Sequence, residues 1–275
     1  MNTTEAIAES FRRPYPVSVP MVLLAALVPF YIFIGESMPG RVLHAPALPL
    51  DRMFPVQPAW ALVYGVLYLF LIVLPVFVVR QQEQIRRTVL AYLMVWLSAY
   101  VVFLTWPTVA PRPPIVTGNG FIAWGLRFLY DADPPYNCFP SLHVAHSFVS
   151  ALTCYRVHRR VGIASIVCAS LVGLSTLFTK QHYVVDVLAG IALAYAAYFV
   201  FLRGYRDEIP ELDRRLAPVL AMGLMTVLGG VLVCCWAVWR ISASPSTPAP
   251  ATRHSRVDRA HTRSSPANAA RAPRA

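Results

Sequence analysis

Two short segments of this chain combine residue types that can move a phosphoryl group. Residues 138–143 read Cys-Phe-Pro-Ser-Leu-His, and residues 180–186 read Lys-Gln-His-Tyr-Val-Val-Asp. Lys180 is the only lysine among the 24 lysine and arginine residues. Phosphoryl transfer needs a nucleophile, an acid–base group and positive charge around the phosphate. The two segments therefore predict this chemistry, without specifying which molecule carries the phosphate.

The second segment contains a histidine–carboxylate pair. On a helix His182 and Asp186 are four residues apart and share a face. A carboxylate that accepts a hydrogen bond from one ring nitrogen fixes the tautomer and leaves the other nitrogen free to attack. An ionisable side chain within an apolar span is a functional candidate. The alternative is a salt bridge from Asp186 to Lys180 or Arg112 that stabilises the helix end.

The first segment predicts a helix that begins at Pro140, because proline is favoured at the first helical position. The following N–H groups, that of Ser141 included, then point out of the helix start and form an anion site. The Ser141 hydroxyl adds a donor, and Arg112 and Lys180 supply positive charge. His143 could protonate a departing oxygen as a general acid. The alternative is a capped helix with an interfacial histidine.

A zinc site is a further alternative. His143, His146, His182 and Asp186 could together ligate the metal. Such a site would leave the helix-start N–H groups without a purpose and would put two cations beside the metal. We therefore predict no metal, and we expect His146 to be a packed polar residue inside its span.

Composition identifies a membrane protein. Hydrophobic residues make up 57% of the chain and charged residues only 13%, with a mean hydropathy of +0.53. A soluble domain carries about 25% charged residues. This balance excludes a soluble nucleic-acid binder, although the formal net charge is +11.

The chain contains seven apolar stretches of the length that a membrane span requires. They cover residues 14–35, 53–79, 88–111, 134–155, 161–179, 183–202 and 216–239. The fold predicted from them is an all-α membrane helix bundle of six or seven spans. The expected domains are spans 1–87, a catalytic core 88–205, a C-terminal span 206–240 and a disordered tail 241–275.

Arginine placement predicts the orientation of the bundle. With a cytoplasmic N-terminus and alternating spans, the inner side receives twelve arginines and the outer loops five basic residues. This bias follows the positive-inside rule. The candidate residues then share the outer side. The longest outer loop, 110–139, should hold an aromatic-anchored helix at 121–130 that lies in the interface.

Taken together, these residues resemble the type 2 phosphatidic acid phosphatase superfamily over residues 90–205. The second motif of the family is Pro-Ser-Gly-His, and Leu142 replaces its glycine here. The third motif has its histidine and aspartate at His182 and Asp186, but Thr176 replaces its arginine. The first motif ends at Arg112 and Pro113. The lysine of this first motif is also missing from the chain.

These departures resemble the inositolphosphotransferase and sphingomyelin synthase-like branch. The resemblance implies that His182 is the nucleophile, that Asp186 orients it, and that His143 protonates the leaving group. It also implies that Arg112, Ser141 and Lys180 hold the phosphate. No cofactor and no metal are implied.

The expected function is phosphoryl transfer from a lipid phosphate or lipid diphosphate ester in the bilayer, through a phosphohistidine intermediate. Water as acceptor makes the chain a phosphatase, and an alcohol such as inositol makes it a head-group transferase. The expected location is the plasma membrane, with the active site on the outer side. The rival interpretation is a non-catalytic membrane scaffold or carrier.

Overall fold

A computed structural model describes residue 5 and residues 19–242 of the chain. Two units are distinguished, Met1–Trp236 and Ala237–Ala275. Of the second unit, only the residues that continue the last helix are described. The tail predicted for residues 241–275 therefore lies almost wholly outside the described residues.

The described residues form helices and contain no strand, only two isolated bridges. The helices are α2 (Val19–Glu36), α3 (Trp60–Val78), α4 (Gln82–Thr105), α5 (Phe121–Ala132), α6 (Leu142–Val157), α7 (Arg159–Phe178), α8 (Val184–Ala197) and α9 (Glu211–Ser242). A 3₁₀ turn covers Pro49–Met53, and a π turn at Tyr198–Leu202 extends α8. The predicted all-α membrane bundle is confirmed.

Five helices are long and apolar enough to cross a membrane: α3, α4, α7, α8 with its π turn, and α9. Two expected spans are shorter. The apolar part of α2 is Met21–Glu36, and α6 has 16 residues. Eight of the α6 residues are histidine, serine, threonine, cysteine, tyrosine or arginine, which shortens its apolar stretch. Most of α6 is buried by its neighbours.

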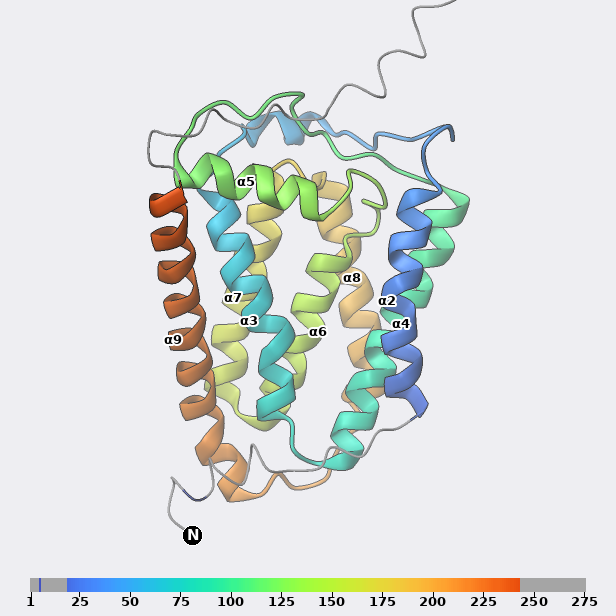
Figure 1. Ribbon diagram of the computed structural model, residues 1–275. Coiled ribbons are helices and arrows are strands. Elements are labelled where there is room, and N and C mark those ends of the chain that lie inside the picture. The colour runs from blue at the N-terminus through green and yellow to red at the C-terminus, as the bar shows by residue number, and fades with distance from the viewer. Residues whose placement is uncertain (1–4, 6–18, 243–275) are drawn as a thin grey trace, which may run out of the picture. The chain divides into compact units, whose positions relative to one another are not determined.

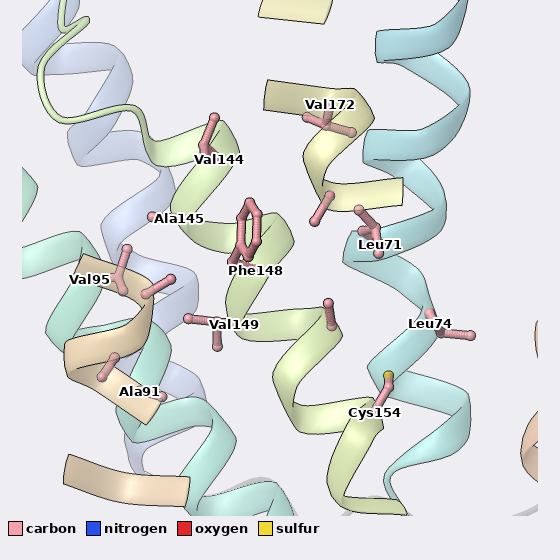
Figure 2. Close-up of a cluster of buried hydrophobic side chains, with 14 of the residues drawn as sticks. Leu71, Leu74, Ala91, Val95, Val144, Ala145, Phe148, Val149, Cys154 and Val172 are labelled. Atoms are coloured by element: carbon pink, nitrogen blue, oxygen red, sulfur yellow. The ribbon is translucent and has the colours of Figure 1, made fainter. Parts of the chain in front are cut away.

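Helix α6 is the centre of the bundle. It packs against α3, α4, α7 and α8. Figure 2 shows the core around it: the α6 side chains lie between Ala91 and Val95 of α4 on one side and Leu71 and Leu74 of α3 on the other. Because α6 is enclosed, the polar side chains at its start are held in fixed surroundings.

Helix α5 lies across the ends of the upright helices, as Figure 1 shows. It packs against α3, and Ala123 and Leu126 face inward. Trp124 and Phe128 are exposed and their rings stack. The helix predicted in the outer loop is therefore present, with apolar side chains on its free face. Both sequence motifs lie at this end of the bundle.

Candidate active site

The two sequence motifs are joined through their backbones. The N–H of Ser141 donates to the carbonyl oxygen of Asp186 at 3.1 Å. Helices α6 and α8 approach closely at this point. A Cβ atom added at Gly190 would lie 2.6 Å from the carbonyl oxygen of Ser141. The motifs are thus fixed side by side by main-chain contacts.

His182 lies in the turn between α7 and α8. The N–H groups of Gln181 and His182 both donate to the carbonyl oxygen of Thr176, at 2.9 and 3.3 Å. Helix α8 begins only at Val184. The sequence placed His182 and Asp186 on one helix, but only Asp186 is helical. The carboxylate of Asp186 reaches back and accepts from the N–H of Tyr183 at 2.8 Å.

The two motif histidines meet. Nδ1 of His143 lies 3.2 Å from Nε2 of His182. The other ring nitrogen of His182, Nδ1, lies 3.4 Å from Oδ2 of Asp186. His182 is 5% exposed and Asp186 is fully buried. Among the described residues no ion pair joins Asp186 to Lys180 or Arg112, so the alternative of a helix-end salt bridge has no support in the geometry.

A second carboxylate, which the sequence analysis missed, faces His143. Oδ2 of Asp133 lies 3.9 Å from Nε2 of His143 and 3.8 Å from the Arg112 guanidinium. The hydroxyl of Tyr31 on α2 donates to Oδ1 of Asp133 at 3.0 Å. His143 therefore lies between a carboxylate and a second imidazole, and Asp133 bridges it to Arg112.

Two tyrosine rings of α3 enclose the His143 ring. The ring centres of Tyr64 and Tyr68 lie 5.4 and 4.9 Å from that of His143, both edge-on. Such aromatic contacts restrict the orientation of the imidazole. They leave the ring nitrogens facing His182 and Asp133.

Arg112 is held at the rim of the site. It donates from Nη2 to Oε1 of Gln181 at 2.8 Å and from Nη1 to the carbonyl oxygen of Tyr130 at 3.1 Å. Its guanidinium also lies 4.6 Å from the centre of the Tyr130 ring. Its Nε is buried and has no hydrogen-bond partner. The guanidinium is thus held in place, and its Nε–H remains available to donate a hydrogen bond.

Tyr130 supports this arginine as a neutral side chain. Burial raises the pKa of Tyr130 to about 12, although the charge of Arg112 lowers it. The protonated hydroxyl donates to the carbonyl oxygen of Thr179 at 2.6 Å. Helix α5 is thereby joined to the turn that carries His182.

The start of α6 differs from the expectation. Helix α6 begins at Leu142 rather than at Pro140, and Ser141 is its capping residue. Oγ of Ser141 accepts from the N–H of Val144 at 3.3 Å. The Ser141 N–H is occupied by Asp186, so it is not one of the free amides that the sequence predicted. The serine hydroxyl supplies the helix cap because its short side chain can reach back to the first turn.

Two other candidates face away from the histidine pair. The ammonium of Lys180 donates to the carbonyl oxygen of Asp51 at 3.2 Å, and no hydrogen bond or ion pair joins it to the other candidates in the described part of the chain. His146 accepts a hydrogen bond from the indole of Trp96. No group of three metal-binding side chains occurs among residues 19–242.

A family comparison now bears on this site. A sequence model of the PAP2 superfamily matches residues 48–200, which is more than half of the chain. The chain belongs to the PAP2 superfamily. The part shared with the PAP2 superfamily runs from before α3 to beyond α8 and includes both histidines and Arg112.

Two relatives are similar to parts of this PAP2 superfamily member. A PA-phosphatase related-family protein of Dictyostelium discoideum is 33% identical over 112 residues, covering 35% of this chain and 20% of the relative. An uncharacterized protein of Methanocaldococcus jannaschii is 27% identical over 103 residues, covering 38% of this chain and 41% of the relative. The chain thus matches less than half of either relative. No solved structure matches it.

The described helices support a multi-pass membrane protein. Asp133 and Tyr31 had no signal in the sequence, because neither belongs to a motif of fixed spacing.

Proposed function

We propose that this chain is a membrane-embedded phosphatase that hydrolyses a lipid phosphate or lipid diphosphate ester through a phosphohistidine on His182. The observation that carries the proposal is the 3.2 Å distance between Nδ1 of His143 and Nε2 of His182. It brings an imidazole backed by a carboxylate within reach of a second imidazole. A phosphate that separates the two rings would contact a nucleophile and an acid at once.

The first step is attack by Nε2 of His182 on phosphorus. Asp186 retains the proton on Nδ1 and stabilises the positive charge that forms on the ring. The phosphorus–oxygen ester bond breaks. The departing oxygen takes a proton from Nδ1 of His143, which must start as an imidazolium. Burial of the ring disfavours that charged form, and Asp133, facing the other nitrogen, offsets this effect in part.

The second step releases the phosphate. His143, now neutral, takes a proton from a water molecule, and the water oxygen attacks the phosphohistidine. The nitrogen–phosphorus bond breaks, and inorganic phosphate leaves while His143 regains its charge. Phosphoryl transfer depends chiefly on such positioning and on charge stabilisation. Neither step requires a metal or another cofactor.

Three residues are proposed to hold the phosphate oxygens: Arg112, Ser141 and Lys180. Arg112 has the strongest support, because its buried Nε has no hydrogen-bond partner. Ser141 can donate its hydroxyl hydrogen while its oxygen caps α6. Lys180 would first have to leave the carbonyl oxygen of Asp51.

A head-group transferase is the second candidate. It uses the same phosphohistidine, and an alcohol such as inositol replaces water in the second step. The observation that favours it is the sequence pattern of the motifs, in which Leu142 follows Pro-Ser and Tyr183 follows His182. These features resemble the inositolphosphotransferase and sphingomyelin synthase-like branch.

The reaction is proposed to occur at the outer side of the plasma membrane. The support is the excess of arginine in the loops assigned to the cytoplasmic side. The motif histidines, Arg112 and α5 lie at the opposite end, where α5 presents Trp124 and Phe128. Aromatic side chains of this kind are enriched at membrane interfaces.

A product assay separates the candidates. Purified full-length protein is incubated with phosphatidic acid labelled in the phosphate, with and without inositol, beside the His182→Ala variant. Released phosphate that the variant does not produce supports the phosphatase, and labelled inositol phosphate supports the transferase. Absence of both products across a panel of lipid phosphates and diphosphates supports the scaffold or carrier and contradicts the proposal.

A further inference from the structure

A cavity of about 550 Å³ lies next to the histidine pair, within the bundle. Helices α2, α3 and α4 form its walls, and His146 of α6 closes it on the inner side. Its lining includes Ala25 and Val28 of α2, Tyr68, Ile72 and Val76 of α3, and His146 of α6. The volume is that of a small-molecule site, for which roughly 300–1,000 Å³ is usual.

Four of the five polar side chains of the wall are hydrogen-bonded within the protein. Trp96 donates to His146. The hydroxyl of Tyr92 lies 2.6 Å from Oγ of Ser150, and Thr88 donates to the carbonyl oxygen of Gln84 at 2.7 Å. A polar ligand would find few partners there, and burying it would be unfavourable. The cavity suits hydrocarbon.

The cavity and the candidate active site share a wall. Tyr68 lines the cavity, and its ring centre is 4.9 Å from that of His143. His146 follows His143 by one helical turn on α6. From Tyr68 the lining continues along α3 to Val79, a distance of about 16 Å at 1.5 Å per residue. The cavity therefore extends from the histidines toward the opposite end of the bundle.

The mouth of the cavity is apolar. Val28 on α2 and Ile72 and Val76 on α3 are 49%, 39% and 51% exposed. Helix α2 packs on α4, and in Figure 1 α6 is seen between α2 and α3. Exposed aliphatic side chains on apolar helices of a membrane bundle face lipid in a bilayer. A hydrocarbon chain can thus pass from the bilayer into the cavity without crossing a polar barrier.

We infer that this cavity binds one hydrocarbon chain of the lipid substrate while its phosphate lies between His143 and His182. The inference rests on the proposed function and adds a determinant of specificity. Because the lining ends at Val79, Ile85 and Val89, the cavity accepts a limited chain length. Substrates whose chain fills it gain affinity with each buried methylene group, at roughly fourfold per group.

Two neighbouring alanines of α2 provide a matched pair of variants. Both are exposed, but Ala25 lines the cavity and Ala26 is not part of the lining. Ala25→Trp fills part of the cavity, and Ala26→Trp adds the same side chain outside it. We expect Ala25→Trp to lower kcat/KM for dioleoyl phosphatidic acid at least about tenfold, the effect of excluding two methylene groups. The kcat/KM for dioctanoyl phosphatidic acid should fall only slightly. Equal losses for both lipids, or the same loss in Ala26→Trp, would overturn the inference.

A binding measurement keeps this test separate from catalysis. A lipid phosphate with a photoreactive group near the end of its chain is bound to the inactive His182→Ala protein, illuminated, and located by mass spectrometry. Adducts should fall on residues 72–79 and 85–96, and Ala25→Trp should reduce them while Ala26→Trp does not. Adducts confined to the outer faces of α7 and α9 would contradict the inference, whether or not the protein proves to be a phosphatase.

Discussion

At the scale of single residues, the site holds each histidine beside its own carboxylate. Asp186 lies behind His182, and Asp133 lies behind His143. The two carboxylates serve opposite needs. The nucleophile needs a neutral ring with a fixed tautomer, and the general acid needs a charged ring. The Tyr31 hydroxyl and Arg112 keep Asp133 in place.

Asp133 is therefore expected to act as a positioning residue for His143. The Asp133→Asn variant should lower kcat for alkyl phosphate esters about 10²-fold, within the range of general acid catalysis. The kcat for a nitrophenyl phosphate ester should fall much less, because its leaving group needs no proton. Steady-state kinetics on the two substrates measures the difference.

The neighbouring Asp131→Asn variant is the control, since Asp131 is exposed. It should leave both substrates unaffected. An equal fall in kcat for the two esters in Asp133→Asn would indicate that this carboxylate supports the fold rather than the general acid, His143.

Sequence reasoning at this scale succeeded where residue spacing is fixed by a motif. His143, His182 and Asp186 belong to two short segments, and the structure brings them together. Asp133 comes from a loop rich in proline and aspartate, and its hydrogen-bond donor Tyr31 is about a hundred residues away. Contacts of this range depend on packing, and no local pattern specifies them.

At the scale of elements, the site depends on the close approach of α6 and α8. Gly190 permits it, because any larger side chain would meet the backbone of Ser141. The same contact brings the carbonyl oxygen of Asp186 to the Ser141 N–H. One small residue in α8 thus aligns the two helix starts that carry the histidine motifs.

Gly190→Ala is expected to push α8 from α6. The added Cβ would lie 2.6 Å from a backbone oxygen, and such overpacking is destabilising by about 1–3 kcal/mol. Turnover should fall as well, since His182 and His143 would separate. Gly65→Ala on α3 is the control, because nothing lies within 4 Å of its added Cβ. Thermal unfolding in detergent measures the stability of the two variants, and an activity assay measures their turnover. Equal stability and equal turnover would contradict this role of Gly190.

The helix starts show where a sequence pattern is insufficient. Proline at the first helical position was a sound expectation for α6, but the helix begins two residues later. Ser141 caps it, and Asp186 of the neighbouring helix takes the serine N–H. A tertiary contact decided the position of the first turn, and the sequence of α6 alone does not contain it.

At the scale of the whole chain, the apolar stretches predicted the helices and their order well. Each expected span corresponds to a helix, and the loop helix α5 was also expected. The short length of α6 was not expected; its histidines, its serines and Thr153 interrupt the apolar run. Helix α4 supplies partners for two of these residues, since Tyr92 bonds with Ser150 and Trp96 donates to His146.

The proposed sidedness can be measured with single cysteines. In a variant whose five native cysteines are replaced, Asn119→Cys lies in the loop beside α5 and Arg86→Cys lies at the opposite end, and both positions are exposed. An impermeant maleimide should label Asn119→Cys in intact cells. It should label Arg86→Cys only after the membrane is opened. The reverse labelling pattern would indicate that the active site faces the cytoplasm.

The central claim, a covalent phosphate on His182, has a direct test. Purified protein is mixed with a lipid phosphate that carries a radiolabelled phosphate, quenched in alkali, digested, and the labelled peptide sequenced. The account predicts label on His182, lost in acid and absent from His182→Ala. Lipid phosphate hydrolysis that persists in His182→Ala, with no label on the wild-type histidine, would contradict it.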